Sequence, residues 1–126
     1  MKTSSRLSVV LAVLVFALSQ GYLAQLVHQL RPNILFLQLT FDPVRYWAIL
    51  EAWGAEGERA YREHFAYDFF HLVIYAACGH IVATRSALFA PAACRMALIT
   101  AWLLPLAAVF DLAENLLQLH LLAGPV

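Results

Sequence analysis

The sequence has 126 residues, of which 63% are hydrophobic and only 13% are charged, and its formal net charge is zero. A water-soluble domain this small carries about a quarter charged residues and cannot bury so much apolar side chain, so a soluble globular fold is excluded and a lipid bilayer is the expected surroundings. The 8 Lys and Arg residues are scattered and form no stripe, which argues against a nucleic-acid partner.

The first predicted membrane span is Leu7–Val27, a run of 21 residues without a charge. About 20 apolar residues are enough for a helix to cross the hydrocarbon core. Lys2 and Arg6 precede this run, and Ala17-Leu18-Ser19 forms a small-x-small pattern, so the alternative is a signal peptide cleaved after Ser19. Because the apolar run continues past this pattern, we favour a first helix that is retained.

Residues 28–64 form the one sizeable connection of the chain. Asp42-Pro43 is typical of a helix start, and Gly54 is typical of a helix end. The mixture of apolar, aromatic and charged residues between them predicts a short interfacial helix lying on the bilayer. Ahead of it, Ile34–Phe41 has apolar residues at alternate positions, which predicts either a short strand or an extended segment pressed on the membrane.

The second predicted span is Phe65–Thr84, and the third is Met96–Leu122, which starts after Pro91 and Arg95. Pro105 lies inside the third span, but a single proline kinks a membrane helix and does not reverse it. We therefore expect an all-α bundle of three spanning helices that forms a single transmembrane domain over residues 1–126. The alternative is four spans, with the last segment folded as a hairpin.

The distribution of positive charge gives the expected orientation. The N-terminus and the 85–95 loop together hold four Lys and Arg residues, and the long connection also holds four. The 85–95 loop carries only basic charges, whereas the connection mixes its arginines with five acidic residues. We therefore place the N-terminus in the cytoplasm and residues 28–64 outside.

Each predicted span carries polar side chains on one face. Successive residues of a helix are about 100° apart around its axis, and one set of polar residues on each span falls within an arc of about 100° or less. On the first span these are Gln25 and His28, with Gly21, and on the second they are His64, Asp68, His71 and Tyr75. On the third span they are Asp111, Glu114, Asn115 and Gln118. An acid at the centre of a spanning helix costs roughly 2.5–3.5 kcal/mol, so it must be paired, protonated or close to water. A helix rises about 1.5 Å per residue, and on this scale the polar groups of the three spans lie at the same depth in the bilayer. The sequence therefore predicts a shared polar cluster in the outer half of the bilayer.

A convergent cluster of Asp, Glu, His and Asn side chains is compatible with several roles. It can hold the helices together as a hydrogen-bond network, bind a small amphipathic ligand, or form an ion or proton path. If it binds a metal, the ligands are His64, Asp68, His71 and Glu114, and the protein is a metal-dependent lipid hydrolase or isomerase. No catalytic motif is present. We therefore favour a protein without enzymatic activity or cofactor, acting alone, as a homo-oligomer, or as a small subunit of a larger membrane complex.

Two segments carry a resemblance to a known group of proteins. Trp53-Gly54-Ala55-Glu56-Gly57 with Tyr61 and Asp68 gives the pattern W-G-x-E-G…Y…D, and residues 104–115 give L-P-L-x-A-x-x-D-L-x-E-N. Together with the apolar helix between them, they span about half of the chain. This pattern resembles a group of small bacterial polytopic membrane proteins with no assigned activity. The resemblance implies a location in the bacterial inner membrane and no particular reaction.

Overall fold

The computed structural model describes residues 3–86 and 94–124. Within these residues the protein has helices α1 (Thr3–Val27), α2 (Ile34–Gln38), α3 (Pro43–Arg85) and α4 (Cys94–Leu122). Three of them, α1, α3 and α4, are long and apolar enough to cross a membrane. The predicted all-α fold with three spanning helices is thus confirmed. Pro91, after which we expected the third span to start, lies outside the described residues.

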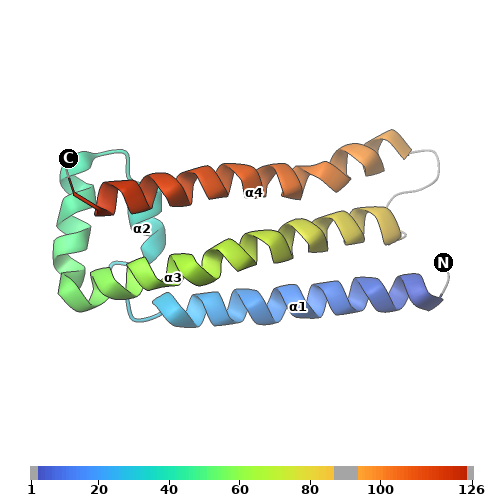
Figure 1. The fold of residues 1–126 in the computed structure, drawn as a ribbon, viewed down its shortest axis with the longest axis horizontal. Helices are drawn as coiled ribbons and strands as arrows, with labels where there is room; N and C mark the ends of the chain where they lie inside the picture. The colour runs from blue at the N-terminus through green and yellow to red at the C-terminus, as the bar shows by residue number, and fades with distance from the viewer. Residues whose placement is uncertain (1–2, 87–93, 125–126) are drawn as a thin grey trace.

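The three long helices lie side by side, with α3 between α1 and α4 (Figure 1). In the most apolar stretch of each helix, 22% of α3 is buried, against 6% of α1 and 11% of α4. Most large apolar side chains of α1 and α4 are therefore exposed, as they must be where lipid is the surrounding solvent. The first and last described residues lie at opposite ends of this bundle, as an odd number of spans requires (Figure 1).

The last span is a single helix. α4 continues through Pro105 to Leu122 without a reversal of the chain. No glycine, asparagine or polar cluster stands near Pro105 to make a turn. The alternative of a terminal hairpin, and with it a fourth span, is therefore wrong.

The second spanning helix begins much earlier than its apolar run. Asp42 caps the start of α3 by accepting a hydrogen bond from the Val44 backbone N–H at 2.9 Å. The helix is interrupted only at Gly54, whose φ of 63° and ψ of −176° are open almost exclusively to glycine. At this point the chain turns, so the part of α3 before Gly54 lies across one end of the bundle (Figure 1). The helix that we expected between Asp42 and Gly54 is therefore joined directly to the second span.

The segment Ile34–Phe41 is neither a strand nor extended, and that prediction is wrong. Residues Ile34–Gln38 form the short helix α2, which begins where the Asn33 side chain accepts a hydrogen bond from the Leu35 N–H at 3.0 Å. Leu37 alone among its alternate apolar residues is buried. The Asn33 cap and the buried Leu37 side chain thus favour a short helix here, in spite of the alternation of apolar residues.

The main hydrophobic core lies at the end of the bundle that carries α2. It joins the connection to α3 and to the last turn of α4, and consists of Leu30, Leu37, Tyr46, Leu50, Trp53, Tyr61, Phe65 and Leu122. The Trp53 indole N–H donates to the Pro32 carbonyl at 2.7 Å, which fixes the connection on this core. The connection, α3 and the last turn of α4 are therefore fixed to one another at this end of the bundle.

Candidate ligand cavity

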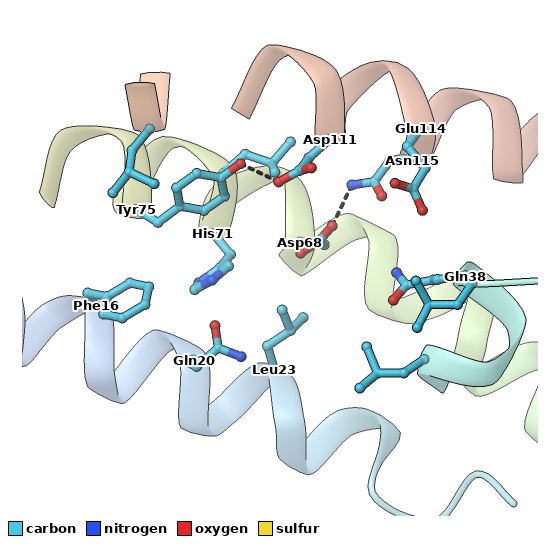
Figure 2. A pocket seen from close by; sticks show the side chains of 14 residues that line it. Phe16, Gln20, Leu23, Gln38, Asp68, His71, Tyr75, Asp111, Glu114 and Asn115 are labelled. Carbon is cyan, nitrogen blue, oxygen red and sulfur yellow. Dashed lines mark hydrogen bonds between the residues drawn. The ribbon is translucent and has the colours of Figure 1, made fainter. Parts of the chain in front are cut away.

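A cavity of about 490 Å³ lies between the three long helices, next to α2 (Figure 2). Each helix contributes both polar and apolar side chains to its wall. The lining residues are Phe16, Gln20 and Leu23 of α1; Leu35, Gln38 and Leu39 at α2; Asp68, His71, Leu72 and Tyr75 of α3; and Leu104, Asp111, Glu114 and Asn115 of α4.

Two hydrogen bonds join α3 to α4 along the wall of this cavity. The Asn115 side-chain amide donates to Asp68 Oδ2, and the Tyr75 hydroxyl donates to Asp111 Oδ2 (Figure 2). Asn115 is only 4% exposed, so its amide needs a partner within the protein. These bonds fix the two acids on the cavity side of their helices.

A second set of contacts joins α1 to α3. His71 Nδ1 lies 2.8 Å from Ser19 Oγ, and the Tyr67 hydroxyl donates to the same Ser19 oxygen at 3.0 Å. Phe16 stacks on the His71 ring with a centroid distance of 5.7 Å. His71 is therefore held in one orientation by a hydrogen bond on one side and an aromatic ring on the other.

Glu114 differs from the two aspartates. Its side chain lines the same cavity but is exposed, and within residues 3–86 and 94–124 it makes no hydrogen bond or ion pair. The cavity wall thus contains three carboxylates, of which Asp68 and Asp111 each accept one side-chain hydrogen bond. No lysine or arginine is among the residues that line it.

A smaller cavity of about 290 Å³ adjoins the first between α1, α2 and α3. The two cavities share a common wall, which is formed by Gln20, Leu23, Leu35, Gln38 and Asp68. The smaller cavity continues toward the connection, where His28, Asn33 and His64 line it. The smaller cavity therefore extends from Asp68 toward the connection, with both polar and apolar side chains in its wall.

The structure brings most of the predicted polar residues to these cavities, but not all of them. Asp68, His71, Tyr75, Asp111, Glu114 and Asn115 line the main cavity, and His28 and His64 line the smaller one. Gln25 is exposed and lines neither. Gln118 is buried in a separate contact with Tyr46. Of Gln25 and His28, the two polar residues predicted for the first span, only His28 therefore lines a cavity.

The polar residues that α1 brings to the site are Gln20, which lines the cavity, and Ser19, which contacts His71; neither belongs to the predicted polar arcs. Gln38 of α2 and Tyr67 of α3 were missed as well. The signal for the first two was in the sequence, because Ser19-Gln20 is the only polar pair inside a long apolar run. In the sequence alone, Ser19 also ends the small-x-small pattern Ala17-Leu18-Ser19, which is the basis of the alternative of a cleaved signal peptide.

The metal site proposed as an alternative has no support in the geometry. Among the side chains that the structure describes, no group of three or more His, Cys, Asp and Glu residues could hold a metal ion. His64, Asp68, His71 and Glu114 therefore do not form a ligand set there. The alternative of a metal-dependent lipid hydrolase or isomerase thus loses the ligand set on which it depends.

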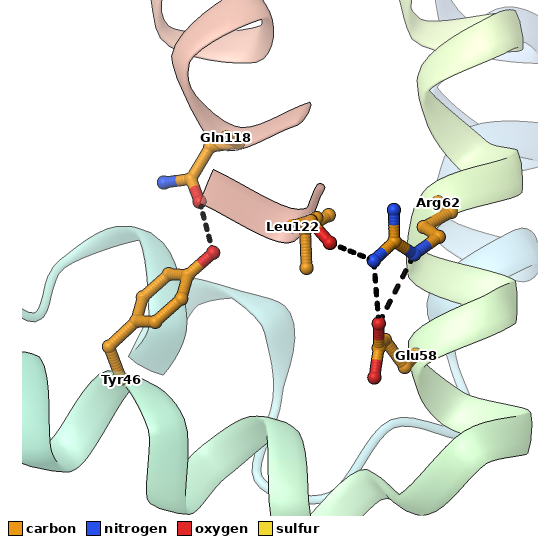
Figure 3. A network of polar contacts seen from close by, with 5 residues as sticks. All are labelled: Tyr46, Glu58, Arg62, Gln118 and Leu122. Carbon is orange, nitrogen blue, oxygen red and sulfur yellow. Dashed lines mark hydrogen bonds and ion pairs between the residues drawn. The ribbon is translucent and has the colours of Figure 1, made fainter. Parts of the chain in front are cut away.

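A second polar cluster lies at the end of the bundle and is separate from the cavity (Figure 3). We call Tyr46, Glu58, Arg62, Gln118 and Leu122 the end cluster. The Tyr46 hydroxyl donates to Gln118 Oε1 at 3.1 Å, and the Arg62 guanidinium donates to Glu58 Oε1 at 2.8 Å and to the Leu122 carbonyl. Burial raises the pKa of Tyr46, partly opposed by the charge of Arg62, so the phenol keeps the proton it donates.

Comparisons of the chain with protein-family models, curated proteins and solved structures found no match. The resemblance to small bacterial membrane proteins therefore stays a prediction. The fold and the buried contacts of Ser19, His71 and Asn115 define the class: a multi-span helical membrane protein with an internal polar network.

Proposed function

We propose that the protein binds a small amphipathic molecule in the cavity between α1, α3 and α4. The observation that carries this proposal is the composition of the cavity wall, which combines apolar side chains with a few convergent polar groups. Sites for small molecules have this composition, and their volumes are about 300–1,000 Å³. The cavity of about 490 Å³ falls within that range. Phe16, Leu72 and Leu104 offer contacts for a hydrocarbon tail.

The hydrogen-bond network supports binding by fixing the walls of the cavity. The Asp68–Asn115 and Tyr75–Asp111 bonds hold α4 on α3, and the His71–Ser19 contact holds α1 on α3. One such bond between membrane helices contributes about 0.6 kcal/mol on average and at most about 1.7 kcal/mol. The same side chains therefore stabilise the bundle and keep the cavity open for a ligand.

The proposal includes the location and sidedness of the protein. The cavity lies in the half of the bundle next to the connection and α2, and the ends of α3 and α4 that carry Arg85 and Arg95 are at the other end. With the N-terminus in the cytoplasm of a bacterial cell, the site lies in the outer half of the inner membrane. The smaller cavity lined by His28 and Asn33 then gives a polar head group access from the outer surface.

The proposed role requires no reaction and no cofactor. The exposed apolar faces of α1 and α4 are available to lipid, to a second copy of the chain, or to other subunits of a membrane complex.

The test is a search for a co-purifying molecule that the cavity retains. Leu23 lines both cavities, so Leu23→Trp fills them, whereas Leu18 is 75% exposed and Leu18→Trp adds the same bulk on the lipid-facing side. We expect mass spectrometry of extracts to find an amphiphile that accompanies the wild type and Leu18→Trp in near-stoichiometric amount and is lost from Leu23→Trp. A helical Leu23→Trp variant with the same extract as the wild type would contradict the proposal.

A further inference from the structure

We propose that the polar head of the ligand is positively charged, so that the preferred ligand is an alkylammonium-type amphiphile. This inference rests on the proposed function, because it names the chemistry of the molecule that the cavity holds. The observation behind it is that the cavity wall holds three carboxylates and no lysine or arginine.

The ionisable groups that face the cavity are strongly unbalanced. α3 contributes Asp68, His71 and the phenol of Tyr75, and α4 contributes Asp111 and Glu114. α1 and α2 contribute only the neutral amides Gln20 and Gln38. No lysine or arginine lines either cavity. Like charges at short range in a medium of low dielectric constant repel, so a cation among them lowers the free energy of the bound state.

The hydrogen-bond inventory has the same imbalance. An ionised carboxylate offers about four acceptor sites and no donor. Asp68 and Asp111 each use one site in the described bonds, and Glu114 uses none within the described part of the chain. A carboxylate or phosphate head group would add further acceptors. An ammonium group has three donors and no acceptor, and therefore complements this wall.

Aromatic rings complete the surroundings of a cation. Phe16 and Tyr75 line the cavity on either side of His71 (Figure 2). The face of an aromatic ring attracts an ammonium group, more strongly when water is excluded. The carboxylates and the aromatic rings of the cavity wall therefore favour the same charge on the ligand.

The experiment compares three probes with the same tail and different head charge: dodecylammonium, dodecanol and dodecanoate. Protein in a neutral maltoside detergent is titrated with each probe, and the Kd is taken from the thermal shift of unfolding. A hydrogen bond to a charged group contributes about 1.5–3 kcal/mol, so we expect dodecylammonium to bind on the order of tenfold to a hundredfold more tightly than dodecanol. Dodecanoate should bind most weakly.

Isosteric variants then locate the charge that matters. Glu114→Gln should reduce the affinity for dodecylammonium about tenfold and leave that for dodecanol unchanged. Asp111→Asn, which keeps an acceptor for Tyr75, should act in the same direction. Glu63 is exposed on α3 outside both cavities, so Glu63→Gln removes the same charge as a control and should have no effect.

The outcomes separate this inference from the proposed function. Equal binding of dodecylammonium and dodecanol that is lost in Leu23→Trp would leave the ligand cavity standing and overturn the positive head group, as would preference for dodecanoate. Loss of dodecylammonium binding in Glu63→Gln to the same degree as in Glu114→Gln would also overturn it. Failure of all three probes to distinguish the wild type from Leu23→Trp would overturn the cavity itself as a binding site.

Discussion

The two polar clusters of the protein use the same kinds of side chain but differ in how completely these are paired. In the end cluster, Tyr46 donates to Gln118, and Arg62 donates to Glu58 and to the last turn of α4 (Figure 3). This cluster rests on the main hydrophobic core, to which Tyr46 and Leu122 belong. In the cavity, by contrast, acceptors outnumber the donors that meet them.

The difference shows which property separates a structural polar cluster from a binding site in a membrane protein. Both clusters contain acids, amides and tyrosines, so the residue types alone do not distinguish them. The balance of charge and of hydrogen bonds does, because a matched set of groups has no further need of a ligand. An unmatched set around a cavity is more stable when a complementary molecule is bound.

The largest expected effect compares two tyrosines on the same face of α3. Tyr61 is fully buried in the core beneath the end cluster, whereas Tyr75 lines the cavity. Tyr61→Ala should lower the free energy of unfolding by about 3–5 kcal/mol, as for other large aromatic residues in cores. Tyr75→Ala should cost about 1–2 kcal/mol, because it loses one interhelix hydrogen bond and fewer packing contacts. Denaturant titration in mixed micelles, followed by tryptophan fluorescence, measures both.

Tyr61→Phe is the control for the first comparison. It removes only the hydroxyl, which has no partner in the described structure, so stability should stay the same or rise. Equal losses for Tyr61→Ala and Tyr75→Ala would show that the cavity wall is packed like the core, and would remove the contrast between the two regions.

An intermediate effect is expected at the hydrogen bond between Tyr46 and Gln118. Tyr46→Phe leaves Gln118 Oε1 without its donor, and Gln118 is only 9% exposed. The expected loss is about 1–2 kcal/mol in the free energy of unfolding. Tyr22 is half-exposed on α1 and touches the Tyr67 ring, so Tyr22→Phe is a matched control that should change little. A Tyr46→Phe variant as stable as Tyr22→Phe would show that the end cluster is not what fixes α4.

Much of the fold could be predicted because it follows from local sequence. The uncharged run Leu7–Val27 and the long apolar segment through Pro105 give the first and third spans. The polar faces of α3 and α4 could also be predicted, since the i, i+3, i+4 and i+7 spacing from Asp68 and Asp111 places side chains on one side whatever the helix packs against. Asp68, His71, Asp111 and Asn115 do line one cavity.

The remainder depends on tertiary contacts that no local pattern contains. The rotation of α1 is set by Phe16 and Ser19 against His71, and this turns Gln20 toward the cavity and Gln25 away from it. Gln118 shares the polar arc of α4, but the turn at Gly54 brings Tyr46 to it and removes it from the site. The polar face of a helix predicts how deep its side chains lie in the membrane and to which side of the helix they point. It does not predict which neighbouring residues contact them.

The smallest expected effect is at Glu114, where the contrast between the clusters is sharpest. If the three cavity acids are arranged for a ligand and not for the fold, removing one charge without changing its shape should cost the empty protein nothing. Glu114→Gln should therefore change the free energy of unfolding by less than about 0.5 kcal/mol, or raise it by relieving repulsion from Asp68 and Asp111. Glu63→Gln, measured in the same denaturant titration without added amphiphile, gives the reference for an exposed acid of α3. A loss above about 1 kcal/mol in Glu114→Gln alone would mean that this carboxylate holds the bundle together, and the cavity cluster would then be structural like the end cluster.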